Sequence, residues 1–147
     1  MKNIYQWYKF SNSLYKKKIP VFPQAIKFLI RLLFAAVIPY TAEIGEGTKF
    51  GYGGLAIVIH ANCKIGKNCT ISQGVTLGGT NHKGLVPVLG DNVFIGAGAK
   101  ILGPITIGNN VVIGANAVVV KDIPANSLAV GIPAKVVKND ININDYI

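Results

Sequence analysis

The sequence has little charge, and acids are especially scarce. Only 14% of its 147 residues are charged, and 6 acids stand against 15 lysines and arginines. Half of the residues are apolar and 17 are glycine, a composition that excludes a disordered chain and favours closely packed, tightly turned backbone. The length suits one main domain with its own core. We therefore expect a folded globular protein.

Cations are scarce in the body of the chain and gather at its N-terminus. Residues 1–42 contain seven lysines or arginines and no acid. The remaining residues carry eight lysines against six acids, a net charge of only +2. The body therefore offers no basic face of the kind that a nucleic-acid-binding domain needs, and we expect no nucleic-acid partner.

Cysteine and histidine are nearly absent. Cys63 and Cys69 are the only cysteines, and the N-terminus does not have the pattern of a signal peptide, so we expect reduced thiols in a cytoplasmic protein. His60 and His82 are the only histidines, and with two isolated cysteines the chain offers few soft ligands for a closed structural zinc site. We predict no metal, and we interpret both cysteines as small core residues.

A long uninterrupted hydrophobic run is also missing. The most apolar stretch, QAIKFLIRLLFAAVI at 24–38, predicts a helix that Pro23 begins and Pro39 ends, but it is too short and too charged to span a bilayer. Two interpretations stay open. Residues 1–40 could pack on the body or on another subunit, and they could form a peripheral contact with anionic lipid at the inner face of the membrane; the two are not exclusive.

A six-residue repeat runs through the rest of the chain. Neither helix nor plain strand has this period, which instead fits short strands joined by corners, three to a coil, with inward residues stacked from coil to coil. Glycine follows the apolar residue in eight of the twelve hexads, and we interpret it as permitting a sharp corner. The apolar positions are Ile44, Phe50, Ile59, Ile65, Ile71, Leu77, Leu89, Ile95, Ile101, Ile107, Ile113 and Val119.

The repeat predicts an all-β solenoid with three segments along the chain. These are a basic, aromatic helical segment at 1–42, the solenoid at 43–138 and a tail at 139–147. Two interruptions break the period, a spacing of nine between Phe50 and Ile59 and one of twelve between Leu77 and Leu89. The second holds GGTNHKGLVPV and predicts one loop extruded from the coil, where functional groups often lie.

His60 occupies a place that is glycine in most hexads. Because Ile59 points inward, the side chain of His60 should point out of the coil. Histidine titrates near neutral pH and suits a base that takes a proton from a hydroxyl group. We predict that His60 is catalytic; the alternative is an exposed histidine without a role.

Three stretches carry a family resemblance: NCTISQGVTLGGT (68–80), GDNVFIGAGAKILGPITIGNN (90–110) and VVVKDIPANSLAVGIPAKVVK (118–138). With the repeat, they resemble the hexapeptide-repeat acyltransferase superfamily, in its serine acetyltransferase-like branch with short polysaccharide-modifying members. The resemblance implies a left-handed parallel β-helix with an N-terminal helical segment, a homotrimer and an O-acetyltransferase that uses acetyl-CoA. The handedness comes from the resemblance, because crossover connections are otherwise right-handed.

The resemblance also implies site residues. His82, in the extruded loop, corresponds to an active-site histidine of related sugar acetyltransferases and in a trimer would approach His60 of a neighbouring chain. Ala97 and Ala115 lie eighteen residues apart, so they should stack on one wall. Together with three lysines they match positions that contact coenzyme A in the superfamily: Ala97, Ala115, Lys121, Lys135 and Lys138.

One departure from the family concerns the base. Serine acetyltransferases carry an Asp-His pair before the aliphatic run, where this chain has Gly51-Tyr52-Gly53-Gly54. His60 therefore resembles a relocated base. The group that orients it stays open among Glu43, Glu46, Asp91 and a backbone carbonyl.

The acceptor that we expect is a sugar hydroxyl of a bacterial surface polysaccharide or its precursor. The large helical domain typical of serine acetyltransferases is missing, and the N-terminus is basic and aromatic, which favours a saccharide acceptor near a membrane. The alternative enzyme is a minimal serine O-acetyltransferase of cysteine biosynthesis. A γ-type carbonic anhydrase, which needs three histidine ligands, is disfavoured by two histidines, and a non-catalytic scaffold is the third class.

Overall fold

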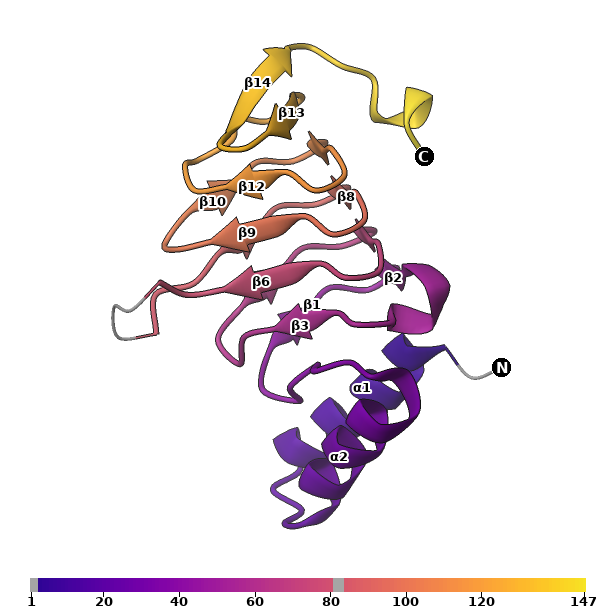
Figure 1. Ribbon diagram of the computed structural model, residues 1–147. Coiled ribbons are helices and arrows are strands. Elements are labelled where there is room, and N and C mark those ends of the chain that lie inside the picture. Colours follow the sequence, from indigo (N-terminus) through magenta and orange to yellow (C-terminus); the bar gives the residue numbers. More distant parts are fainter. Residues whose placement is uncertain (1–2, 81–83) are drawn as a thin grey trace.

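The repeat of six folds into very short strands joined by corners (Figure 1). The computed structural model describes residues 3–80 and 84–147. Twelve strands of two or three residues follow one another: β1 (Glu43–Ile44), β2 (Lys49–Phe50), β3 (Val58–Ile59), β4 (Lys64–Ile65), β5 (Thr70–Ile71), β6 (Thr76–Gly78), β7 (Val88–Leu89), β8 (Phe94–Ile95), β9 (Lys100–Leu102), β10 (Thr106–Ile107), β11 (Val112–Ile113) and β12 (Val118–Val119).

Every third strand joins the same sheet, so the coils stack into a solenoid with three faces. The β1 sheet has the order β1-β4-β7-β10, the β3 sheet has the order β12-β9-β6-β3, and the β2 sheet contains β2, β5, β8 and β11. All pairs among these strands are parallel. The register sets Ile59 beside Leu77 and Leu77 beside Ile101, and all three are at most 1% exposed. The predicted all-β solenoid is confirmed.

The glycines that follow the apolar residues are needed for space rather than for an unusual backbone. Gly96, at the corner after the β2 sheet, does not have a positive φ, but a Cβ placed on it would lie 2.6 Å from the backbone nitrogen of Ala115 in the next coil. The positive φ values at the corners belong largely to asparagines, such as Asn92 and Asn110 with φ of 55°, a residue that tolerates this region. These glycines therefore permit the corners by leaving room for the next coil, not by adopting a left-handed conformation.

Both interruptions of the period have a structural counterpart. The first is a 3₁₀ turn, η1 (Gly51–Gly54), which lies beside the helices at the base of the solenoid. The second separates β6 from β7, where the chain leaves the stack of coils (Figure 1). Residues 81–83, and with them His82, lie outside the described residues.

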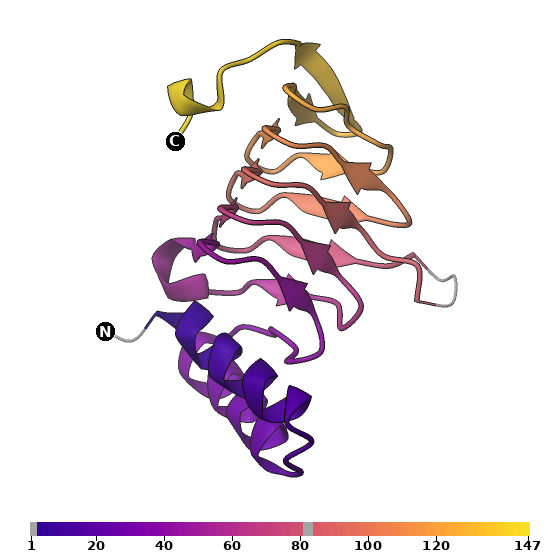
Figure 2. The same cartoon turned by 180° about the vertical axis from the view of Figure 1, so that it is seen from behind.

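Two helices cover the N-terminal end of the solenoid, α1 (Ile4–Lys16) and α2 (Phe22–Phe34), which lie side by side (Figures 1 and 2). We expected α2, although at 24–38; it ends earlier because Ala35 adopts a left-handed conformation. The helical segment that we expected at 1–42 also contains α1, which we did not predict as a separate helix. Ile4, Tyr8 and Ser11 are buried at helical spacing, so α1 packs through the face that these residues share.

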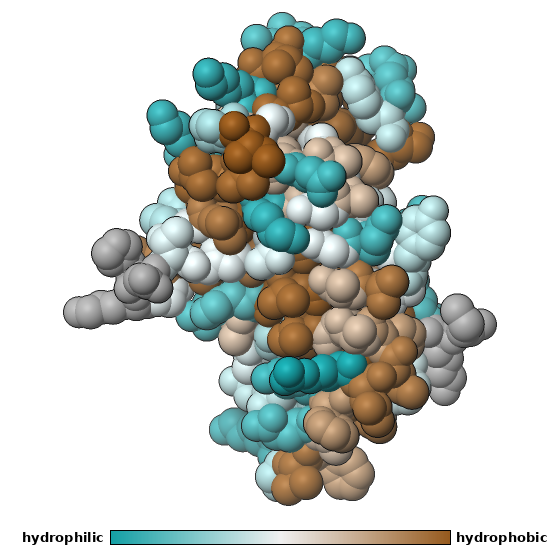
Figure 3. Space-filling model, viewed as in Figure 1, coloured by the Kyte–Doolittle hydropathy of each residue, from teal (hydrophilic) through white to brown (hydrophobic). Residues whose placement is uncertain are grey.

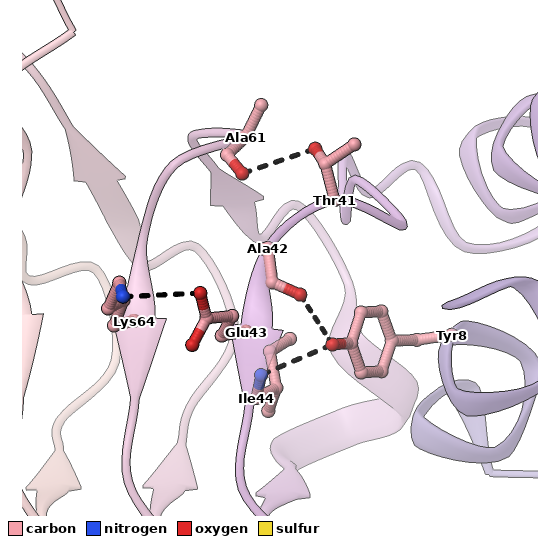
Figure 4. A network of polar contacts seen from close by, with 7 residues as sticks. All are labelled: Tyr8, Thr41, Ala42, Glu43, Ile44, Ala61 and Lys64. Carbon is pink, nitrogen blue, oxygen red and sulfur yellow. Dashed lines mark hydrogen bonds and ion pairs between the residues drawn. The ribbon is translucent and has the colours of Figure 1, made fainter. Parts of the chain in front are cut away.

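The Tyr8 side chain joins α1 to the first coil (Figure 4). Its hydroxyl donates to the carbonyl oxygen of Ala42 at 2.5 Å and accepts from the backbone N–H of Ile44 at 3.2 Å. Burial raises the pKa of Tyr8 to about 12, so the hydroxyl keeps its proton at neutral pH. The aromatic residues that suggested a lipid anchor thus include one that packs inside the protein.

The C-terminal end is closed by an antiparallel hairpin. Strands β13 (Leu128–Gly131) and β14 (Ala134–Lys138) extend the β2 sheet, and a short 3₁₀ turn, η2 (Ile143–Asp145), follows them along the side of the solenoid (Figure 2). Because β14 runs against its neighbour, it ends the parallel stacking.

Two further features bear on the expectations from the sequence. Cys63 and Cys69 are buried in the core, and burial raises the pKa of Cys63 to about 11, as expected of small core residues. No helix in the described part of the chain has the length and apolar character needed to cross a bilayer.

Candidate active site

His60 lies at the corner after β3 and its side chain points into solvent. Its backbone N–H donates to the carbonyl oxygen of Leu77 in the next coil at 2.9 Å. The equivalent residues of the later coils are Gly78, Leu102 and Val120, so this corner has room for side chains. Our view of His60 as an exception to a glycine rule is therefore wrong at this corner: glycine predominates after the β1 and β2 sheets only.

The His60 ring is held by Asn62. The backbone N–H of Asn62 donates to Nδ1 of His60 at 3.2 Å, and the Asn62 side-chain amide donates to the carbonyl oxygen of Gly84 at 3.4 Å. Because Nδ1 accepts this hydrogen bond, the tautomer assigned to the neutral ring carries its proton on Nε2. Asn62 thus links the histidine to the segment that separates β6 from β7.

The acids considered as partners of His60 are engaged elsewhere. Glu43 pairs with Lys64 at 3.2 Å, as Figure 4 shows, and Glu46 pairs with Lys9 at 3.1 Å. The Asp91 carboxylate accepts from a backbone N–H at 2.7 Å. In the described residues, none of these acids and no backbone carbonyl bonds to the His60 ring. No pattern in the sequence indicated that a backbone N–H group of Asn62 would contact the ring instead.

Ala97 and Ala115 lie in adjacent coils at the corner after the β2 sheet. The carbonyl oxygen of Ala97 accepts from the backbone N–H of Asn116 at 2.8 Å. Ala115 is exposed and Ala97 is half-buried, so small side chains form the wall at this corner. In every coil, a strand of the β3 sheet lies between the corner after the β2 sheet, where the alanines lie, and the kind of corner that holds His60. The alanines and His60 therefore lie at opposite edges of the β3 sheet.

The three lysines lie toward the C-terminal end and all are exposed. Lys121 follows β12, at the same kind of corner as His60 but at the other end of the β3 sheet. Lys135 and Lys138 lie on β14, beside the β2 sheet. A single chain therefore does not bring His60, the two alanines and the three lysines into one pocket.

A hollow near the helices contains none of the described residues that we predicted to be catalytic or to contact coenzyme A. It measures about 740 Å³ and lies between α1 and the β1 sheet, with Tyr5, Lys9, Glu43, Glu46 and Asp91 among its lining residues. Desolvation raises the pKa of Tyr5 there. Across the part of the chain that the structure describes, no three His, Cys, Asp or Glu side chains gather as metal ligands.

Two family descriptions match the solenoid. "Bacterial transferase hexapeptide (six repeats)" matches residues 87–121, and "Hexapeptide repeat of succinyl-transferase" matches residues 56–79. Among curated relatives, the serine acetyltransferase of Staphylococcus xylosus is 46% identical over 88% of this chain and 61% of its own length. That of Synechococcus elongatus is 42% identical over 84% of this chain and 51% of its own. The chain belongs to the hexapeptide-repeat acyltransferase superfamily, in its serine acetyltransferase-like branch.

Solved members of this superfamily share the fold. The serine acetyltransferase of Neisseria gonorrhoeae aligns with a TM-score of 0.86 and 34% identity over 93% of this chain and 53% of that chain. The Brucella abortus serine acetyltransferase in complex with coenzyme A aligns with a TM-score of 0.87 and 31% identity over 92% and 55%. The solenoid is a left-handed parallel β-helix, as the resemblance implied. The chain spans about half to three-fifths of the length of these relatives.

The expected polysaccharide acceptor is wrong. The curated relatives named above, which match 84–88% of this chain, are serine acetyltransferases, so the short length of the chain relative to them does not indicate a sugar acceptor. The basic, aromatic N-terminus does not indicate one either, because α1 packs on the first coil through Tyr8.

Proposed function

We propose that this chain carries an O-acetyltransferase activity that moves the acetyl group of acetyl-CoA to the hydroxyl of serine. The observation that carries the proposal is the 46% identity to a serine acetyltransferase across 88% of the chain. Support for the substrates comes from solved relatives, one in complex with coenzyme A and another, from Neisseria gonorrhoeae, in complex with serine. The latter is 35% identical over 90% of this chain and 55% of its own, with a TM-score of 0.84.

We assign the general base to His60. Acetyl transfer requires a group that takes the serine proton as the hydroxyl oxygen attacks the thioester carbon, and that returns a proton to the departing thiolate. Nδ1 is the nitrogen with the lone pair in the tautomer assigned from this hydrogen bond, and the bond that occupies it is long, exposed and made by a backbone N–H. In the proposed complex the serine hydroxyl replaces that N–H at Nδ1. His82 is a second candidate for positioning the acceptor.

Coenzyme A binds, in this proposal, along the wall of Ala97 and Ala115, with Lys121, Lys135 and Lys138 near its phosphates. Small side chains let the pantetheine arm lie close to the backbone, and exposed ammonium groups attract phosphate. Since His60 and the alanines lie at opposite edges of the β3 sheet, one complete site would combine His60 of one copy with the alanines of another. We therefore propose a homotrimer with its sites between subunits.

The test is acetyl transfer from acetyl-CoA, followed by release of the free thiol, with serine and with a panel of sugars and nucleotide sugars. We expect turnover with serine and none with the saccharides. No thiol release with serine at any protein concentration, or release only with a saccharide, would overturn the proposal.

Binding of coenzyme A is tested separately by thermal unfolding. Coenzyme A should raise the melting temperature of the protein by mass action. The rise should shrink in Lys135→Gln and persist in Lys17→Gln, a matched change of an exposed lysine far from β14. An equal rise in melting temperature in both variants would show that Lys135 does not take part in binding coenzyme A.

A further inference from the structure

The outer face of α2 is apolar although it faces solvent. The helix turns its buried face inward through Pro23, Ile26 and Ile30. With about 100° of turn per residue, an arc of about 140° between the polar residues of the helix and this buried face holds only apolar residues. These residues are Phe22, Ala25, Phe28, Leu29, Leu32 and Leu33.

The exposure of this face is large for a folded protein. Phe28 is 65% exposed, Leu32 is 68% exposed and Phe22 is 63% exposed, and Val21 adds to the same end of the helix. Figure 3 shows hydrophobic surface over the part of the molecule where α2 lies. Contiguous apolar surface of this kind marks a contact site rather than ordinary solvent-facing surface.

Cations border the apolar face. Arg31 lies about 60° around the helix from Phe28, at one margin of the face, and Lys27 lies one turn before it, farther from the face. Lys16, Lys17 and Lys18 lie at the end of α1, shortly before α2 in the chain. Residues 1–42 contain no acid at all. An apolar face with lysine and arginine at its edge fits the boundary of an anionic bilayer, where acyl chains meet negative headgroups.

The same charges disfavour a second copy as the occupant. If two copies met face to face through α2, the seven cations of each N-terminal segment would be brought together without an intervening acid, and like charges in an interface repel. We propose that the outer face of α2, with the lysines at 16–18, is a docking surface for anionic lipid membranes. The helix would lie in the plane of the interface, since it is not long enough to cross a bilayer.

The experiment is cosedimentation of the full chain with vesicles of phosphatidylcholine alone and of an equal mixture of phosphatidylcholine and phosphatidylglycerol. We expect binding to the anionic vesicles at least about tenfold tighter than to the neutral ones, with a loss of binding as salt rises. The double variant Phe28→Ser/Leu32→Ser should lose binding, and so should Lys27→Gln/Arg31→Gln. The matched control is Val137→Ser, an exposed apolar residue on β14, which should bind as the unchanged protein does.

Far-UV circular dichroism and thermal unfolding of each variant establish that it folds, which is expected because the altered side chains are largely exposed. Binding to neither vesicle, or equal binding to both, would overturn the proposal. A Phe28→Ser/Leu32→Ser variant that still sediments with anionic vesicles would also overturn it. The same holds if the only change in this variant is a smaller oligomer in solution, which is the result expected if α2 contacts another copy. The assay does not use enzymatic turnover, so its failure is distinct from failure of the proposed activity.

Discussion

The hydroxyl of Tyr8 on α1 lies 2.5 Å from the carbonyl oxygen of Ala42, at the entrance to β1. It also accepts the backbone N–H of Ile44, so one side chain satisfies two backbone groups of the first coil. Coils within the solenoid are paired on both sides, whereas the first coil has no coil beneath it. The helices therefore take over the part that a neighbouring coil plays elsewhere.

Replacing Tyr8 by phenylalanine tests this role. Tyr8→Phe keeps the ring but leaves a carbonyl and an N–H without their partner, and we expect the free energy of unfolding to fall by about 2 kcal/mol. Denaturant unfolding measures the change. Tyr15→Phe serves as the control, because the Tyr15 ring is 49% exposed and its variant should unfold like the original protein. Equal stability of all three proteins would mean that water replaces the Tyr8 contacts.

The same tyrosine predicts a loss of stability in alkali. Burial raises the pKa of Tyr8 from 10.0 to about 12, so above pH 10 the unfolded chain gives up this proton more readily than the folded protein does. The stability that the protonated Tyr8 hydroxyl gives the folded protein is fully present below pH 10 and is lost as the pH rises toward 12. The stability of the original protein should therefore fall more steeply across this window than that of Tyr8→Phe. Parallel pH curves for the two proteins would contradict the assignment.

The sequence predicted the solenoid well because its period is a property of every coil. An apolar residue every sixth position must face inward, and Ile59, Leu77 and Ile101 do so. The period alone, however, does not assign residues to the three corners of a coil. The structure does, and it shows that the corner of Gly96 is crowded while the corner that holds His60 has room for a side chain.

Contacts between distant segments were the part that the sequence could not supply. Ile4, Tyr8 and Ser11 have helical spacing, a signal for α1 that the aromatic composition obscured. The bond from Asn62 to Gly84 joins a corner to an insertion whose course the repeat does not determine. The acceptor was also mistaken, because the repeat describes the scaffold and not the groups that select a substrate.

Asparagines stacked at one corner give a prediction about stability. The side chain of Asn92 donates to that of Asn110 at 3.0 Å, and Asn110 donates to Asn126 at 2.9 Å. Asn110 also has a φ of 55°. Asn110→Ala loses both bonds and keeps a strained backbone, so it should destabilise the protein by about 2–3 kcal/mol.

Asn110→Gly separates the two causes. Glycine adopts a positive φ without strain, so this variant should lose the bonds alone and be more stable than Asn110→Ala by about 1 kcal/mol. Thermal or denaturant unfolding of both variants provides the comparison. If the alanine variant were the more stable of the two, backbone strain would have no part in the effect.

We expect replacement of Asn62 to lower activity with little change in stability. Asn62→Ala keeps the backbone N–H that contacts His60 and removes only the amide that donates to Gly84. That bond is exposed, and its loss should cost less than about 1 kcal/mol. If it places the segment before β7 over the site, kcat/KM for serine should fall several-fold while thermal unfolding stays the same. Unaltered kinetics would show that the bond has no influence on the reaction.

His60 carries the largest predicted effect on turnover. Removing a general base typically costs a factor of about 10²–10⁴ in rate, so His60→Ala should lower kcat with serine by that amount. Because the side chain is exposed and its backbone bond to Leu77 survives the change, the variant should fold normally and still be stabilised by coenzyme A. Retained binding with lost turnover would place His60 in the chemical step. Turnover within about twofold of the original, well below the factor expected of a base, would exclude it and leave His82 as the histidine to test next, through His82→Ala measured in the same assay.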